Sequence, residues 1–190
     1  MRATETLFHE HEVIEAVLDC LEAATHAIEA GEAPCTRTFT EAIEFIRGYA
    51  DGVHHQKEED ELFPILEERG VACEGGPIGV MLAEHDEGRQ LVGEMQEALD
   101  AVETKGDAGP LVGFTRSFIS LLREHIEKEN EVLFPMADGA LQPQDQEDLA
   151  SAFQTADEGG GIIDRFLQMA HDLCHRWDVK FPGPLPAERT

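Results

Sequence analysis

Apolar residues recur every three or four positions along most of the chain, the spacing that places them on one face of an α-helix. Four long seams of this kind run through residues 7–28, 36–58, 78–102 and 111–125, separated by segments rich in glycine and proline. We therefore predict four successive long helices joined by short turns. Pro64 is expected to kink or break the second helix.

Two shorter amphipathic stretches follow, at about residues 143–156 and 162–178, and the second has an apolar face that should pack on the preceding helices. The predicted fold class is therefore all-α, an up-down-up-down four-helix bundle with one or two extra C-terminal helices. We predict the bundle in residues 1–138, a helical extension packed on it in 139–180, and a coil tail in 181–190.

Charge and composition narrow the expected partners and location. The 190 residues carry 14 lysines and arginines against 40 aspartates and glutamates, a net charge of −26. Such a charge repels nucleic acid and anionic lipid, so neither is an expected partner. No stretch approaches the ~20 apolar residues of a membrane span, and the first residues lack the apolar core of a signal peptide. We therefore expect a cytoplasmic location, in which the four widely spaced cysteines remain free thiols.

The most informative motif occurs twice. Residues 54–64 and 125–135 both read His-x-x-x-Glu-x-x-x-x-Phe-Pro. On a helix, positions four residues apart lie on one face, so each copy aims an imidazole and a carboxylate at the same point. Two such points facing each other would form a site with room for two metal ions.

Histidines on the other two long helices extend this repetition. His11 and His85 each follow a glutamate and lie on the apolar seam of their helix. The chain therefore resembles an internal duplication, in which two helical hairpins are related by a pseudo-two-fold axis. Such an arrangement would bring His11, His54, His85 and His125 to the centre of the bundle.

The chemistry of this set favours a metal over a purely structural role. A single histidine on a seam is usually a hydrogen-bonded core residue. Four histidines and two glutamates buried without a counter-charge would be costly, and cations that bind all of them offset that cost. Nitrogen and carboxylate ligands suit iron, manganese or zinc rather than calcium. The Glu-x-x-His signature of ferritin-like proteins and the His-Glu-x-x-His signature of zinc proteases are both absent.

Taken together, these motifs, with Leu-Phe-Pro after each repeated site, resemble the hemerythrin-like HHE cation-binding domain over about residues 5–137. The resemblance implies a four-helix bundle around a non-haem di-iron centre with two bridging carboxylates. It implies that four histidines are terminal ligands, namely His11, His54, His85 and His125. It also implies that Glu58 and Glu129 are the bridging carboxylates. The expected cofactor is two non-haem iron ions joined by an oxo or hydroxo group, with manganese or zinc as substitutes.

The third helix departs from the pattern of oxygen-carrying hemerythrins. Those proteins have a His-x-x-x-His pair there, whereas the positions four before and four after His85 are Met81 and Arg89. The departure argues against reversible oxygen carriage.

His55 is a candidate seventh ligand. At 100° per residue, it shares one arc of the helix with His54 and Glu58. The matching residue of the other repeat is Ile126, so a ligand at His55 would make the two metals inequivalent. The alternative for His55 is a half-exposed polar side chain.

Five other acidic and histidine residues are weaker candidates for a role at the metal site. Glu59, Glu61 and Glu131 could orient the ligating imidazoles, but a charged solvated face is the favoured interpretation for each. His171 and His175 form another pair four residues apart, opposite the apolar face of their helix, which disfavours a second metal site.

Three function classes follow from this set. The leading hypothesis is a non-haem di-iron protein that binds or reacts with a small diatomic or peroxide ligand such as oxygen, nitric oxide or peroxide. The alternative is an iron- or oxygen-responsive regulatory or iron-storage module that acts through metal-coupled stability and partner binding. The third class is an enzyme with catalytic turnover. The sequence contains neither a nucleophile paired with a base nor a phosphate-binding loop to support this class. The oligomeric state is not set by the sequence.

Overall fold

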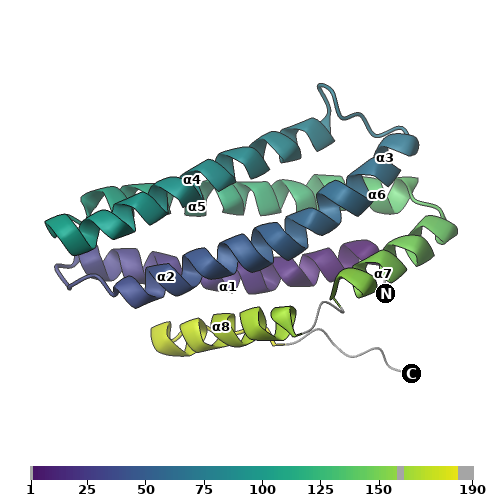
Figure 1. The fold of residues 1–190 in the computed structure, drawn as a ribbon. Coiled ribbons are helices and arrows are strands. Elements are labelled where there is room, and N and C mark those ends of the chain that lie inside the picture. The colour runs from purple at the N-terminus through teal and green to yellow at the C-terminus, as the bar shows by residue number, and fades with distance from the viewer. Residues whose placement is uncertain (1, 158–160, 184–190) are drawn as a thin grey trace.

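The computed structural model describes residues 2–157 and 161–183, and these are helical almost throughout (Figure 1). Because the described residues contain no β-strand, the all-α prediction is confirmed. The α-helices are α1 (Ala3–Glu29), α2 (Thr36–Phe45), α3 (Phe63–Glu68), α4 (Pro77–Lys105), α5 (Gly109–Lys128), α6 (Phe134–Ala140), α7 (Pro143–Asp157) and α8 (Ile162–Trp177). Three π-helical segments lie among them: η1 (Ile46–His55), η2 (Glu58–Leu62) and η3 (Glu129–Leu133). Of the predicted coil tail, residues 184–190 lie outside the described part of the chain.

Four long helical segments run side by side in Figure 1. They are α1, the run from α2 through η1 and η2 to α3, then α4, and the run from α5 through η3 to α6. Contacts join α1 to α2, α2 to α4, α4 to α5 and α5 to α1, so each segment touches two neighbours around a common interior. None of the described helices combines the length and hydropathy that crossing a lipid bilayer requires.

The second long segment does not stop at its proline. The chain remains helical through Pro64 to Glu68, so of the predicted kink or break, the break is wrong. The reason lies in η2, where the Phe63 amide donates to the carbonyl of Glu58, five residues earlier. Pro64 therefore falls in the first turn of the next α-helical stretch, where its missing N–H costs no hydrogen bond.

Two apolar clusters enclose a polar layer between them. Along α1, Leu7 belongs to one cluster and Ile14 to the other, while Glu10 and His11 lie between. The other three long segments also pass from one cluster through the polar layer to the other, in alternating order along the chain. The buried polar residues are thus covered by apolar side chains at both ends of the interior.

The C-terminal helices lie against the outside of the long segments. Helix α8 contacts α1, α2 and η1, and α7 contacts α1 and η2. The indole N–H of Trp177 donates to the hydroxyl of Thr38 on α2 at 3.0 Å. Close approach of α8 requires glycine at position 48, because a Cβ atom there would lie only 1.9 Å from the Phe166 ring. All four cysteines are free thiols, as expected from the sequence.

Candidate metal centre

All seven residues singled out in the sequence meet in the polar layer between the two apolar clusters. They are His11, His54, His55, Glu58, His85, His125 and Glu129. Each is buried, and the most exposed, His55, retains only 7% of its accessible surface. The side chains come from all four long helical segments, so they meet only when the whole fold is assembled.

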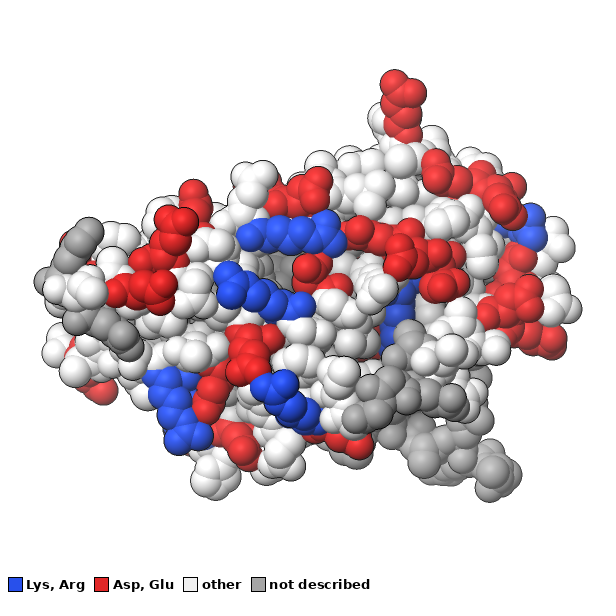
Figure 2. Space-filling view, viewed as in Figure 1, with Lys and Arg blue, Asp and Glu red and all other residues white. Residues whose placement is uncertain are grey.

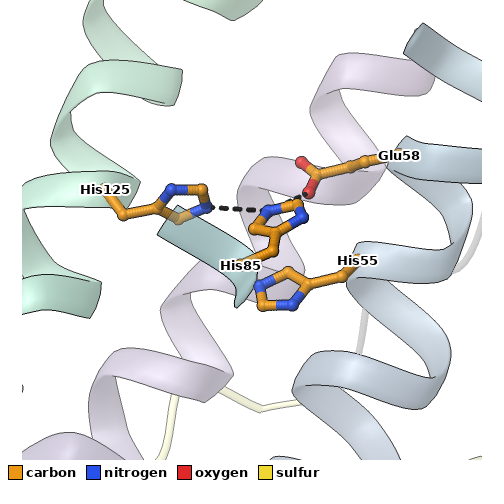
Figure 3. A group of neighbouring side chains, drawn as sticks. All are labelled: His55, Glu58, His85 and His125. Atoms are coloured by element: carbon orange, nitrogen blue, oxygen red, sulfur yellow. Dashed lines mark hydrogen bonds and ion pairs between the residues drawn. The ribbon is translucent and has the colours of Figure 1, made fainter. Parts of the chain in front are cut away.

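Their potential ligand atoms form two groups that share one glutamate. In each group the nitrogen and oxygen atoms lie within 4.8 Å of one another. The groups are His11, His54, Glu58 and Glu129, and His55, Glu58, His85 and His125. Figure 3 shows the second group, in which His55 and Glu58 from one long helical segment converge with His85 of α4 and His125 of α5.

The two oxygens of Glu58 face opposite groups. Oε1 lies 3.6 Å from Nε2 of His54, and Oε2 lies 3.5 Å from Nε2 of His85. A carboxylate with one oxygen toward each of two neighbouring points has the geometry needed to bridge a pair of cations.

Glu129 also lies between histidines of both groups. Its Oε2 is 3.1 Å from Nε2 of His11 and 3.3 Å from Nε2 of His125. The two glutamates of the repeated motif thus occupy the middle of the site.

The inward-facing atoms of this site are poorly satisfied by protein groups. Although Oε2 of Glu129 lies 3.1 Å from Nε2 of His11, no contact among the described residues has hydrogen-bond geometry at Nε2 of His11, His54 or His55, or at any carboxylate oxygen of Glu58 or Glu129. Buried polar atoms normally have partners, because leaving them without one costs free energy. All these atoms are common ligands of iron, manganese and zinc, so the donor set fits a metal centre.

The outward-facing nitrogens, by contrast, have definite partners. Nδ1 of His54 lies 3.0 Å from Oε2 of Glu10, and Nδ1 of His125 lies 3.1 Å from Oε2 of Glu84. A carboxylate at Nδ1 holds the proton there and leaves Nε2 as the electron-pair donor toward the interior.

Each of these carboxylates also accepts from a lysine. Nζ of Lys57 lies 2.5 Å from Glu10, and Lys128 pairs with Glu84 in the same way. The Lys57 side chain is only 1% exposed, whereas that of Lys128 is 42% exposed. The two repeats therefore build the same chain of contacts at different depths.

The remaining two seam histidines have chemically different partners. Nδ1 of His85 lies 2.7 Å from Oε1 of Glu59, whereas Nδ1 of His11 faces the amide oxygen of Asn130 at 2.9 Å. The interpretation of Glu59 as part of a solvated face is therefore wrong. Glu59 and Asn130 occupy matching positions of the repeated motif, which is the sequence signal that could have identified both.

His55 lies deeper than a half-exposed polar side chain. Its ring stacks on that of His85 with centroids 3.8 Å apart, and its Nδ1 lies 3.4 Å from Asp51. The π-helical segment η1 explains the depth, because i→i+5 hydrogen bonds widen the turn. Successive residues then advance less around the axis than in an α-helix, and His55 turns toward the interior beside His54.

Burial favours the neutral form of three of the site histidines, whereas at His125 the carboxylates of Glu129 and Glu84 outweigh burial and raise the pKa. Desolvation lowers the pKa values of His54, His55 and His85, and the neighbouring histidines lower them further. A neutral imidazole is the form that binds a metal ion, so burial keeps these side chains ready for ligation.

The two central carboxyl groups respond oppositely to the same surroundings. Burial and the nearby charge of Glu129 raise the pKa of Glu58 well above its usual range. Burial also opposes ionisation of Glu129, but His125 and His11 outweigh it and hold its pKa well below the usual range. A cation between the two carboxylates would favour the ionised form of both.

Four residues that contact the site histidines or their partners were not identified from the sequence. They stand at matching positions of the two repeats: Glu10 and Glu84, and Lys57 and Lys128. Glu61 is half-buried and Glu131 is exposed, and neither is among the partners of the site. His171 and His175 are exposed on α8, away from both groups.

Comparison with known proteins points the same way. A family model described as the hemerythrin HHE cation binding domain matches residues 2–137. The chain is 36% identical over 88 residues to the iron-sulfur cluster repair protein YtfE of Enterobacter sp. (strain 638), covering 44% of this chain and 40% of that protein. It is 32% identical over 117 residues to YtfE of Edwardsiella ictaluri, covering 59% and 52% respectively.

A more distant relative covers more of the chain. An uncharacterized protein of Mycobacterium tuberculosis is 24% identical over 154 residues, covering 80% of this chain and 60% of that protein. The chain therefore spans about half the length of the curated relatives that it matches. No solved structure matches it significantly.

Proposed function

Because the chain belongs to the hemerythrin HHE cation-binding domain family, we propose that it is a non-haem di-iron protein that binds or reacts with a small molecule such as oxygen, nitric oxide or peroxide. One observation carries the proposal. Two groups of buried nitrogen and oxygen atoms, most of them without hydrogen-bond partners among the described residues, converge on neighbouring points and share Glu58.

The proposed ligands divide between two ions. His11 and His54 would hold one ion, and His55, His85 and His125 the other, with Glu58 and Glu129 as bridges. Bound iron would supply positive charge, a change of oxidation state and exchangeable coordination positions. The protein would supply the orientation of the imidazoles, through carboxylate and amide partners at Nδ1, and the exclusion of bulk water by the two apolar clusters.

We further propose that the four long segments form the up-down-up-down bundle predicted from the sequence. The alternating order in which they pass the two apolar clusters supports this topology. We also propose that nucleic acid is not a partner, because a net charge of −26 repels its phosphates, and that the protein is cytoplasmic.

A second candidate is an iron- or oxygen-responsive regulatory or iron-storage module. The buried polar layer favours it, because filling that layer with cations would stabilise the folded state and thereby report on iron. The name of the YtfE relatives, iron-sulfur cluster repair protein, is compatible with a role in iron handling for this chain. Equal melting temperatures of the iron-free and iron-loaded protein would contradict the second candidate.

Anaerobic reconstitution with ferrous iron tests the leading proposal. We expect two iron ions per chain by elemental analysis, and spectral changes when nitric oxide is added. His11→Ala should reduce the iron content, whereas His26→Ala, at an exposed position on the same helix, serves as the matched control. Less than one iron ion per wild-type chain would contradict the di-iron proposal.

A further inference from the structure

A cavity of about 290 Å³ leads to one side of the proposed metal centre. Its wall is formed by η1, α4 and α5, and its inner end is lined by His55, His85 and His125. The apolar part of the wall consists of Ile46, Ala50, Val92, Phe118, Leu121 and Leu122. His11, His54 and Glu129 do not belong to its lining, so the cavity reaches only one of the two ligand groups.

The charged groups at this cavity mostly pair with one another, except that Arg47, which also lines it, contacts the neutral amide oxygen of Gln96 at 3.5 Å. Arg89 lies 2.8 Å from Asp51, 2.7 Å from Glu59 and 3.0 Å from Asp86, and Glu84 pairs with Lys128. In Figure 2 this face is hollowed beside two basic side chains, in the region where η1 and α4 run side by side in Figure 1. An anion entering here would leave water for an apolar wall and meet an arginine that already faces three carboxylates.

We propose that this cavity is the access route by which a small neutral molecule, of the class of nitric oxide and dioxygen, reaches the ion at His55, His85 and His125. The inference rests on the proposed function and adds to it a direction of access and a ligand class. An apolar wall admits neutral diatomic molecules without the desolvation cost that an anion incurs. The volume far exceeds the ~30 Å³ of one water molecule, so a diatomic ligand has room to pass.

Gly88 on α4 keeps the route open. A Cβ atom at this position would lie 3.8 Å from Phe118 and 4.0 Å from Leu121, which is ordinary contact rather than a clash. The additional carbons of a leucine would therefore extend into the cavity without forcing the backbone to move. Leucine also favours a helix more than glycine does, so Gly88→Leu should not weaken α4.

The same helix provides a matched control. A Cβ atom at Gly93 would meet nothing within 4 Å, and Gly93 does not line the cavity. Gly93→Leu therefore makes the same change of composition on the same helix and leaves the route unchanged. Leu121→Trp fills the cavity from the α5 side and gives an independent test if Gly88→Leu folds poorly.

The experiment measures nitric oxide binding to the iron-loaded protein by stopped-flow spectroscopy. Gly88→Leu should slow association and dissociation together by about tenfold or more, with an unchanged dissociation constant and iron content. Gly93→Leu should match the wild type. Azide serves as the anionic probe, and its association with the wild type should be much slower than that of nitric oxide.

Xenon provides a readout that does not depend on iron, because an apolar cavity of about 150 Å³ is already large enough to bind it. A crystal structure under xenon pressure should show xenon in the cavity of the wild type and Gly93→Leu, and none in Gly88→Leu. The access route would be overturned if nitric oxide bound to Gly88→Leu and Leu121→Trp at the wild-type rates, or if the wild-type cavity held no xenon. Azide entry as fast as nitric oxide would overturn the ligand class. Xenon in the cavity together with no reaction of the iron-loaded protein with nitric oxide, dioxygen or peroxide would instead overturn the proposed function.

Discussion

Oε1 of Glu59 lies 2.7 Å from Nδ1 of His85, and this contact has no charged equivalent in the other half of the site. At the matching position His11 faces the neutral amide of Asn130. A carboxylate at Nδ1 makes the opposite nitrogen a stronger donor than an amide does. The two halves of the repeated motif therefore form two groups of potential ligand atoms with different surroundings, and His55 adds a third nitrogen to only one of these groups.

Glu59→Gln should weaken binding of one ion and leave the other unaffected. The substitution replaces the carboxylate beside His85 by an amide like that of Asn130, and loss of such a partner typically lowers metal affinity by about 10–100-fold. Competition with a metal chelator, followed by elemental analysis, measures the two affinities. Glu61→Gln, a change at a half-buried position outside both ligand groups, is the control. Equal weakening of both ions would contradict the assigned asymmetry.

Lys57→Met should destabilise the metal-free protein far more than Lys128→Met. Removing the ammonium of Lys57, whose side chain is 1% exposed, leaves the buried carboxylate of Glu10 without its counter-charge. Breaking a buried pair in this way costs about 3–5 kcal/mol. Lys128 makes the matching pair with a side chain that is 42% exposed, so its loss should cost about 1 kcal/mol or less. Urea unfolding measures both values, and similar costs would contradict the difference in depth.

Much of the fold and of the inner site could be predicted from periodicity and repetition. The seams of the long helices placed His11, His85 and His125 on buried faces, and the repeated motif added Glu58 and Glu129. Such residues are predictable because a helix fixes which positions share a face, whatever it packs against.

The remainder depends on contacts that a local pattern does not contain. Pro64 was expected to interrupt its helix, but the π-helical turn before it removes the need for its N–H. Lys57 stands in a run of charged residues that resembles a solvated face. It is buried because α7 covers it, with Nζ 5.5 Å from the ring of Phe153. Only the tertiary structure brings a helix from beyond the matched family domain to this position.

His55→Ala should lower iron occupancy at one position and leave the other filled, because Ile126 stands at the matching position of the second repeat. His11→Ala should do more harm, since this position has only one other histidine in its group, and loss of a residue that is 1% exposed also leaves a cavity. Iron content and the optical spectrum of each variant distinguish these outcomes. Full occupancy with an unshifted spectrum in His55→Ala would remove His55 from the ligand set.

Glu58→Gln should affect the metal-free and iron-loaded proteins in opposite directions. Without metal, the buried carboxyl of Glu58 faces that of Glu129, and burial disfavours its charged form. An amide of the same shape relieves this cost, so the free energy of unfolding of the metal-free protein should rise by about 1–3 kcal/mol. With iron, the amide replaces a carboxylate that faces both groups, so iron content should fall at both positions. Thermal unfolding with and without iron, together with elemental analysis, measures the two effects. Loss of only one ion would show that Glu58 does not bridge, and a less stable metal-free variant would show that its carboxyl group is satisfied without a cation.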